Sequence, residues 1–433
     1  MLRSGERIET MGVVVLGAGV SGIAAAYRLE ERGTETTVYE AASNWGGLCG
    51  SFAVNGFRFD TFAHISFDSD TYEWFENQTA HNTFASKALN YDRGRWLRHP
   101  LQEHLYDLPV EERVEIIESF VMRHEDDAER SNYGQWLRAA YGDVFAERYP
   151  YRYTNKYWTV EPEDLETKWI SGRVQKLTLE RMLRGAMDGS LEAVHYSKMA
   201  NYPKKGGFQA FLAPMAERVN VRAGKCAVSI DPIRREIFFS DGDAISYDRL
   251  ISTIPLPNLC AILRGAPKTI RQAAAALHYT SGVTVSVGLS KKSVSPAAWF
   301  YVYDHDLLPS RISSPSWFSA DNTPEGCGSL QAEVYYSTFS PRGMTLPEVE
   351  RQCIRDMVRM GLFEENEVLL TDVREYPYAN IIFTKEIYEA RDLIHGYLAE
   401  IGIDWAGRFG EWDYLWMGQS LKSGFSAAER ILG

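Results

Sequence analysis

The chain has 433 residues, a length that predicts two or three domains. Its apolar fraction of 45% and charged fraction of 24% are those of a globular protein, and they exclude a disordered chain, a collagen-like fibre and a small disulfide scaffold. With 46 basic and 58 acidic residues the formal net charge is −12, so binding of nucleic acid or of an anionic membrane is not expected. An anionic ligand would need positive charge gathered locally.

The five cysteines are scattered and form no Cys-x-x-Cys pair, so the sequence predicts no metal site and no disulfide framework. Reduced thiols favour a cytoplasmic protein. Residues 11–27 are uncharged but contain five Gly or Ser residues, and no other apolar run reaches about 18 residues. We therefore expect no membrane span and no secretory signal.

The N-terminal region has the pattern of a strand, a glycine-rich turn, a helix and a second strand. Residues 13–16 are an apolar run typical of a buried parallel strand. Gly17-Ala18-Gly19-Val20-Ser21-Gly22 follows, and residues 23–29 have helical spacing. The β-rich run 36–39 then leads to Glu40, which lies 18 residues after Gly22.

Each glycine in this unit has a physical task. Gly17 permits the tight turn, Gly19 lets the backbone approach a pyrophosphate, and Gly22 lets the helix pack closely on the strand. The helix N-terminus then faces negative charge, and Glu40 accepts hydrogen bonds from a ribose. The unit predicts dinucleotide binding by Gly17, Gly19, Val20, Ser21, Gly22 and Glu40.

A second glycine pair indicates which dinucleotide binds. Gly46 and Gly47, followed by Leu48, lie within ten residues of Glu40. In flavoproteins that resemble glutathione reductase and the amine oxidases, such a pair extends the cofactor site toward the ribityl chain. The sequence holds no second Gly-x-Gly-x-x-Gly, so FAD is predicted rather than NAD, and Cys49 is expected near the flavin as a filler.

We therefore predict an α/β protein, α+β overall, with a discontinuous Rossmann-type FAD-binding domain. The run 250–255 is the strand that would return the chain to this domain, amphipathic stretches suggest helices over 72–200, and β-type alternation suggests an antiparallel sheet over 280–380. The predicted FAD-binding domain comprises 11–70, 201–270 and 395–433, the helical domain 71–200, and the antiparallel sheet and substrate domain 271–394.

Several segments, in order, resemble the UDP-galactopyranose mutase family of flavoproteins. The segments are Asp60-Thr61-Phe62-Ala63-His64-Ile65, His99-Pro100-Leu101-Gln102, Pro150-Tyr151-Arg152-Tyr153-Thr154-Asn155-Lys156-Tyr157-Trp158, Trp169-Ile170-Ser171-Gly172-Arg173-Val174, Gly407-Arg408-Phe409-Gly410-Glu411-Trp412-Asp413-Tyr414 and Met417-Gly418-Gln419. The last two are the most distinctive. The resemblance implies an isomerase that interconverts the pyranose and furanose forms of an NDP-sugar. In that chemistry, N5 of reduced FAD attacks the anomeric carbon, and the nucleoside diphosphate leaves.

The resemblance also implies site residues by position. Arg173 and Arg311 match arginines that bind the diphosphate, and Tyr376 and Tyr414 match tyrosines that bracket it; taken alone, each is a surface arginine or a core tyrosine. His64 matches the flavin-side histidine, against the alternative of a structural one. Trp158 either walls the nucleotide pocket with Gln102 or is a core tryptophan. Arg408, Met417 and Gly418 are expected at the FAD.

The sequence also departs from the family. Phe62 and Ala63 replace small residues beside the flavin, and Trp416 and Gly418 stand where bacterial members have aspartates. These changes indicate another sugar or base. The implied partners are a nucleotide sugar and an external reductant, NAD(P)H or a flavin reductase; a homodimer is left open. The alternative function is an FAD-dependent oxidase or desaturase of the amine-oxidase or protoporphyrinogen-oxidase type.

Overall fold

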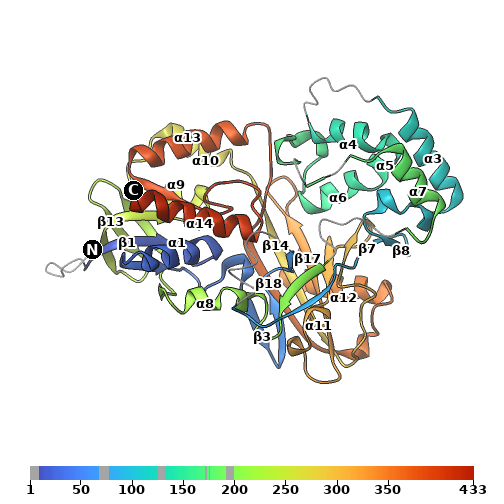
Figure 1. The fold of residues 1–433 in the computed structure, drawn as a ribbon, viewed down its shortest axis with the longest axis horizontal. Helices are drawn as coiled ribbons and strands as arrows, with labels where there is room; N and C mark the ends of the chain where they lie inside the picture. Colours follow the sequence, from blue (N-terminus) through green and yellow to red (C-terminus); the bar gives the residue numbers. More distant parts are fainter. Residues whose placement is uncertain (1–8, 68–77, 125–131, 171–172, 175, 192–198) are drawn as a thin grey trace.

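A computed structural model gives the structure of the protein and describes residues 9–67, 78–124, 132–170, 173–174, 176–191 and 199–433. Ser171 and Gly172 of the predicted segment 169–174 lie outside these residues. An α/β unit containing both chain ends lies at the left of Figure 1, a group of helices at the upper right, and a large sheet below them. The predicted α/β class is confirmed.

The α/β unit is built on a mixed sheet whose centre is parallel. Its strands run in the order β10-β2-β1-β13-β12-β11, and β19 pairs with the end of β13. β1, β2, β10, β13 and β19 are parallel, whereas β12 and β11 are antiparallel additions. The strands are β1 Glu9–Leu16, β2 Thr36–Tyr39, β10 Asn220–Arg222, β11 Ala227–Asp231, β12 Glu236–Phe239, β13 Ala244–Ser252 and β19 Ile403–Trp405.

Helices cover both faces of this sheet, which explains the unbroken apolar run in β1. Val13 and Val15 face the core that includes α1 and α14, while Val14 and Leu16 face the core that includes α9, α10 and α13. A strand buried on both faces needs apolar residues at every position. The helices are α1 Val20–Glu31, α8 Ala213–Ala216, α9 Leu256–Ile262, α10 Lys268–Ala275, α13 Ile387–Glu400 and α14 Met417–Leu432.

The second sheet has the order β18-β14-β17-β16-β15-β7-β8. It is antiparallel as expected, except that β15 pairs with β7 in parallel. Its strands are β7 Ala88–Asp92, β8 Arg95–Arg98, β14 Tyr279–Leu289, β15 Trp299–Val302, β16 Arg311–Ser313, β17 Gly328–Tyr336 and β18 Val368–Ile381, and the nearby helices are α11 Pro315–Phe318 and α12 Leu346–Arg359. Small pairings complete the fold, with β3 Ser51–Val54 against β4 Phe57–Asp60, and β9 Met199–Pro203 between β5 Ser66–Phe67 and β6 His81–Ala85.

The structure differs from the expectation of helices throughout residues 72–200. Described residues between 81 and 98 form β6, β7 and β8 instead. The β7–β8 hairpin lacks hydrophobic alternation because polar residues such as Asn90 and Asp92 are buried in it. The helices of this region are α3 Val110–Val121, α4 Tyr133–Tyr141, α5 Asp143–Arg148, α6 Pro150–Tyr157 and α7 Leu179–Met187. The short turns η2 Leu101–Glu103 and η3 Leu105–Asp107 connect β8 to α3.

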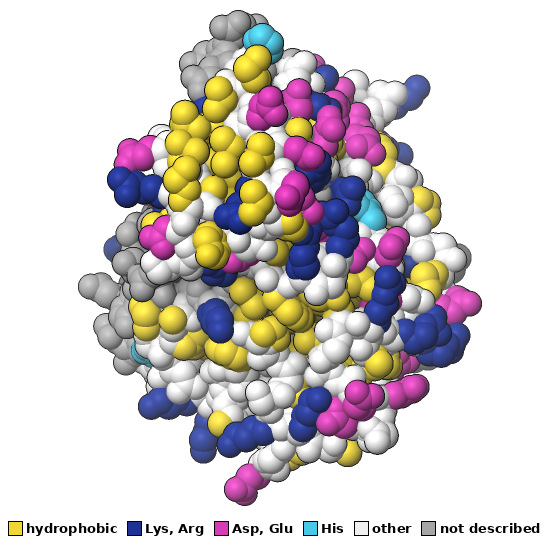
Figure 2. Space-filling view, turned by 90° about the vertical axis from the view of Figure 1, so that its right-hand side faces the viewer, with side chains coloured by type: hydrophobic (Ala, Val, Ile, Leu, Met, Phe, Trp, Pro, Cys, Tyr) yellow, Lys and Arg dark blue, Asp and Glu magenta, His cyan; other side chains and the backbone are white. Residues whose placement is uncertain are grey.

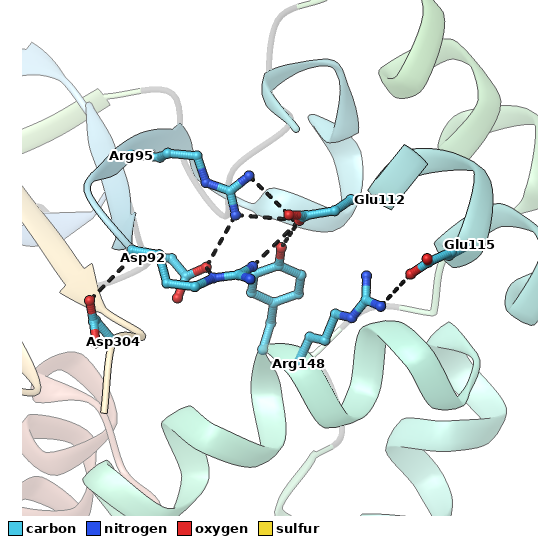
Figure 3. Close-up of polar contacts among 8 residues, drawn as sticks. Asp92, Arg95, Glu112, Glu115, Arg148 and Asp304 are labelled. Carbon is cyan, nitrogen blue, oxygen red and sulfur yellow. Dashed lines mark hydrogen bonds and ion pairs between the residues drawn. The ribbon is translucent and has the colours of Figure 1, made fainter. Parts of the chain in front are cut away.

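A network of ion pairs fastens the helical region to the second sheet (Figure 3). The buried Asp92 carboxylate accepts from Arg93 at 2.9 Å and lies 3.5 Å from Arg95. Arg95 also binds Glu112 of α3, at 3.2 and 3.3 Å. The backbone N–H of Arg93 donates to Asp304 at 3.3 Å, so the network reaches the loop after β15.

The same network continues between helices. The hydroxyl of Tyr149, between α5 and α6, donates to Glu112 at 3.3 Å, and Arg148 pairs with Glu115 one turn further along α3. Glu112 thus links α3 to the β7–β8 hairpin and to the junction of α5 and α6. Charged hydrogen bonds with buried or half-buried partners are stronger than exposed pairs.

Figure 2 shows the outer face of the helical region, where apolar side chains gather beside acidic ones. Exposed apolar residues of α3 and its C-terminal end follow helical spacing, at Val110, Val114, Val121 and Met122. Within the described residues, no helix is both long and apolar enough to cross a bilayer.

We predict that Glu112→Gln lowers the free energy of unfolding by about 1–2 kcal/mol at pH 7. Although burial alone would raise it, the pKa of Glu112 is held below its ordinary value of 4.5 by Arg95, Arg93 and Tyr149. A lowered folded-state pKa stabilises the fold above the unfolded value, and this stability is lost as the pH falls through the folded value. The deficit should therefore shrink below about pH 4.5 in urea unfolding.

The exposed neighbour Glu111 is the control, since Glu111→Gln should leave stability unchanged at pH 7. An equal deficit for Glu112→Gln at pH 7 and pH 4 would contradict the electrostatic role of this carboxylate.

Candidate active site

The predicted glycine turn lies between β1 and α1, and its geometry requires glycine. Gly17 has φ +96°, and a Cβ atom on it would lie 2.4 Å from the Thr253 hydroxyl at the end of β13. A Cβ on Gly22 would lie 1.9 Å from the carbonyl oxygen of Gly17. The first turn of α1 is thus packed against the end of β1 as the sequence predicts.

The second glycine pair packs directly on the first turn. The N–H of Gly46 donates to the Ala18 carbonyl at 2.8 Å, and a Cβ on Gly47 would lie 3.1 Å from the Cα of Gly19. Gly46 and Gly47 have φ +112° and +57°, conformations that favour glycine. Two backbones therefore approach each other with no side chain between them.

The end of β2 and the start of α1 hold the groups that suit a dinucleotide. The Glu40 carboxylate accepts from the N–H groups of Ala18 and Ala42, at 2.7 and 2.8 Å, so it is fixed beside the turn. No side chain caps the N-terminus of α1, where Val20 and Ser21 begin the helix. Its N–H groups and the positive end of the helix dipole suit a pyrophosphate.

The C-terminal segment closes this end of the site. A Cβ on Gly407 would lie 2.5 Å from the Ser21 hydroxyl, so the segment 407–414 lies against the start of α1. Arg408 donates to Asn380 at 3.1 Å, and its guanidinium lies 4.8 Å from the centre of the Tyr414 ring. Met417 and Gly418 begin α14 at the same place.

One cavity of about 1510 Å³ joins these elements to the second sheet and to the helical region. Its volume exceeds the roughly 300–1,000 Å³ of ordinary ligand pockets, and it has room for a dinucleotide and a second ligand. Nearly every predicted site residue lines it, whereas Gly22 packs behind the turn. The predicted residues in the wall are Gly17, Gly19, Val20, Ser21, Glu40, Gly46, Gly47, Leu48, His64, Gln102, Trp158, Arg173, Arg311, Tyr376, Arg408, Tyr414, Met417 and Gly418.

Arg311 reaches the cavity from β16 and forms a two-pronged ion pair with Glu333 of β17. Its Nε and Nη2 atoms donate to the two carboxylate oxygens at 2.8 and 2.9 Å. Glu333 is fully buried and also accepts from the Tyr335 hydroxyl at 2.5 Å and the Ala63 N–H at 2.9 Å. These contacts use two of the five Arg311 donors and fix its plane.

Arg173 reaches the cavity from the other side, between Trp169 and α7. Its guanidinium carbon lies 4.1 Å from the centre of the Tyr414 ring and 4.8 Å from that of Trp416. The two arginines are 138 positions apart in sequence, yet they line the same cavity. The local positive charge that an anionic ligand needs is therefore present in this acidic protein.

His64 is neutral at pH 7. Burial lowers the pKa of His64 to about 4, and the positive charges of Arg311 and Arg408 act in the same direction. Its Nδ1 atom lies 2.8 Å from the Phe62 carbonyl oxygen, which can only accept. In the neutral ring Nδ1 therefore carries the proton, and Nε2 is the acceptor.

The bulky Phe62 is largely buried rather than projecting freely into the cavity. It is 4% exposed, and its ring lies 5.1 and 6.1 Å from the rings of Tyr376 and Tyr335. It occupies the space above Gly282, where a Cβ atom would lie 2.7 Å from the ring. Phe62 thus supports the Tyr376 side chain, and glycine in the strand below makes room for it.

Trp158 and Gln102 lie in the part of the cavity next to the helices. Trp158 is 8% exposed and packs 4.7 Å from the Trp169 ring, so it is a core residue that also forms cavity wall. Its indole N–H is buried without a hydrogen-bond partner in the described part of the chain. Gln102 is half-buried in η2. Cys49 is buried beside the glycine pair, and burial raises the pKa of its thiol to about 12, so it stays protonated.

Two residues that support Arg311 or the loop before it were not singled out by the sequence analysis. Glu333 lies in a buried strand whose sequence looks like ordinary β structure. Lys156 belongs to a recognised segment but had no assigned task. Its ammonium donates to the carbonyls of Asp304 and Leu307 at 2.9 and 2.8 Å, in the loop that leads to Arg311. Burial lowers the pKa of Lys156 to about 7.

Comparison with known proteins places this architecture in a family. The model of the family "Flavin containing amine oxidoreductase" matches residues 20–432, almost the whole chain. The chain belongs to this family. The glycine turn, the uncapped start of α1 and Glu40 fit its cofactor, which is FAD.

Among solved structures, reduced UDP-galactopyranose mutase is similar to this protein over 98% of this chain and 96% of the mutase chain, with 25% identity and a TM-score of 0.91. The predicted resemblance to that family is confirmed. Within the described residues, no group of three or more His, Cys, Asp or Glu side chains is arranged to hold a metal ion.

Curated relatives match this chain only locally. Protoporphyrinogen oxidase 2 of Arabidopsis thaliana is 42% identical over 65 residues, which are 15% of this chain and 13% of that protein. The 4,4'-diapophytoene desaturase of Staphylococcus aureus strain COL is 40% identical over 82 residues, which are 19% and 15% of the two chains. The matched parts thus cover about a seventh of these relatives.

We predict that Gly22→Ala abolishes most flavin binding, with at least a tenfold lower ratio of flavin to protein absorbance. The added methyl group would lie 1.9 Å from a backbone oxygen, so α1 must move away from the turn. Gly396→Ala is the control, because the exposed Gly396 of α13 has open space around it. That variant should keep its flavin and gain about 0.5–1 kcal/mol of stability. A normal flavin content in Gly22→Ala would contradict the role of the glycine turn in flavin binding.

Proposed function

We propose that this protein is a flavin-dependent isomerase that interconverts the pyranose and furanose forms of a nucleoside diphosphate sugar. The full-length similarity to reduced UDP-galactopyranose mutase carries the proposal. The cavity supports it, because Arg173 and Arg311 border the same space as the dinucleotide cradle. A diphosphate between two guanidinium groups is a good leaving group.

Reduced FAD would supply a nucleophilic nitrogen, N5, for the anomeric carbon of the sugar. Arg173 and Arg311 would bind the diphosphate and stabilise the negative charge that grows as its bond to the sugar breaks. The hydroxyl groups of Tyr376 and Tyr414 would donate to phosphate oxygens from either side. Glu333 would hold Arg311 in one plane, so that little reorganisation accompanies the reaction.

The remaining cavity residues would position the other parts of the substrate. Neutral His64 offers Nε2 as an acceptor near the flavin end. Gln102 and the indole N–H of Trp158 are the polar groups on the side of the helices, where the nucleoside would bind. The departures at Phe62, Ala63, Trp416 and Gly418 favour a substrate that differs from UDP-galactose in its sugar or its base.

The proposal includes partners that the sequence predicts. A nucleotide sugar is the substrate, and NAD(P)H or a flavin reductase supplies the electrons that keep the flavin reduced. A cytoplasmic location is a further prediction of the sequence analysis, which leaves a homodimer open.

The second candidate is an FAD-dependent oxidase or desaturase. The local identities to a protoporphyrinogen oxidase and to a diapophytoene desaturase favour it. A buried ion pair and a second arginine in the cavity wall argue against it, because an apolar substrate would have to desolvate these charges without compensation.

We predict turnover of an NDP-hexopyranose to an isomeric product by the dithionite-reduced protein under anaerobic conditions. A panel of uridine, thymidine, guanosine and cytidine diphosphate hexoses, followed by chromatography and NMR, would identify the product. The oxidised protein is the control and should be inactive, because oxidised flavin is not nucleophilic. Activity confined to the oxidised protein, with consumption of oxygen, would establish the oxidase alternative instead.

We predict that Arg173→Ala weakens binding of the best nucleoside diphosphate by about 10- to 100-fold, because each lost charged contact is worth about 1.5–3 kcal/mol. Flavin content should not change. Arg184→Ala, at an exposed arginine of α7, is the control and should bind normally. For the second arginine, Arg311→Lys is preferable to Ala because it keeps Glu333 paired. Unchanged nucleotide affinity in both variants would contradict the assignment of Arg173 and Arg311 as diphosphate-binding residues.

A further inference from the structure

The guanidinium of Arg173 contacts two aromatic rings, those of Tyr414 and Trp416. Its central carbon lies 4.1 Å from the ring centre of Tyr414 and 4.8 Å from that of Trp416. Arg173 belongs to the segment between Trp169 and α7, whereas both rings belong to the segment that leads into α14. The contact therefore joins two parts of the chain across the cavity.

Hydrogen bonds support the same arrangement. The Nη2 atom of Arg173 donates to the Tyr414 carbonyl and to the side-chain oxygen of Gln419, the latter at 3.2 Å. The same Gln419 oxygen accepts from the Trp416 N–H at 2.9 Å. The Gln419 side-chain amide thus ties Arg173 to Trp416, the residue just before α14.

The two rings are held in place from behind. Tyr414 packs on Trp169 and Phe383, with ring centres 6.0 and 5.9 Å away. Trp416 lies 6.5 Å from the Phe67 ring and remains 42% exposed in the cavity wall. A guanidinium beside these two rings is attracted by their π faces, and the contacts restrict its orientations.

Position 416 is also where the sequence departs from the aspartate of bacterial mutases. A carboxylate beside Arg173 would pair with it and compete with phosphate oxygens for the same donors. An indole face attracts the guanidinium without adding a negative charge.

We propose that Trp416 is a positioning residue that holds the Arg173 guanidinium in the cavity, ready to bind the diphosphate of the substrate. The inference rests on the proposed function and extends it. Trp416 acts through Arg173, so its contribution to nucleotide affinity exists only while the arginine is present. Its loss should weaken nucleoside diphosphate binding about 5- to 30-fold.

The test is a double-mutant cycle on the flavin-loaded protein, read by titration calorimetry. UDP, dTDP, GDP and CDP are screened on the native protein, and the one that binds most tightly is used throughout. Trp416→Leu should weaken its binding about 5- to 30-fold, and Trp416→Phe should restore most of the affinity because it keeps a π face. In an Arg173→Ala background, Trp416→Leu should have no further effect.

Trp317 provides a matched control. It is 40% exposed on α11, and the Lys87 ammonium lies 5.9 Å from the centre of its ring. Trp317→Leu should leave nucleotide affinity unchanged. Flavin content, measured for every variant, verifies that the site is folded.

The outcomes separate this inference from the proposed function. If the native protein binds a nucleotide but Trp416→Leu leaves affinity unchanged, or weakens it equally with and without Arg173, the positioning role is overturned while the proposed function stands. If none of the nucleotides binds the native protein, the proposed function fails and the inference fails with it.

Discussion

The rest of the structure depends on the tight packing of backbone against backbone around the first glycine turn. Gly22 of α1 lies on the carbonyl of Gly17, Gly47 lies on Gly19, and Thr253 of β13 fills the space beside Gly17. Three segments of the chain therefore meet at a point where Gly17, Gly22 and Gly47 have no room for side chains of their own. The cavity begins at this junction, and the positions of β1, β2, β13 and α1 all depend on it.

A second constraint is electrostatic. The protein carries a formal charge of −12, yet Arg173 and Arg311 are among the basic residues that line its cavity. They are held by different means, Arg311 by a buried carboxylate and Arg173 by aromatic rings. A carboxylate fixes direction but reduces net charge, whereas rings fix direction and leave the charge intact. Under the proposed function, the two supports would give the two ends of a diphosphate unequal environments.

Site residues could be predicted from the sequence alone where they form a short local pattern. Gly17, Gly19 and Gly22 could be assigned because their spacing between a strand and a helix is a recognisable local pattern. Arg173 and Arg311 depended on a family resemblance, because nothing local distinguishes them from surface arginines. Glu333 could not be foreseen, since a buried carboxylate in β17 has a meaning only once Arg311 is paired beside it. The strands β7 and β8 were missed for a related reason, because ion pairs across the chain replace the apolar residues that usually reveal a strand.

The last helix of the chain lies against the first. A Cβ on Gly424 of α14 would lie 2.2 Å from the Ser21 carbonyl, and Ser21 in turn donates to the Ser420 carbonyl at 2.8 Å. During synthesis the glycine turn emerges from the ribosome about 400 residues before the helix that completes its surroundings. The cofactor site is therefore completed only once α14 has been synthesised, and until then the incomplete chain must keep its apolar N-terminal strand and helix from aggregating.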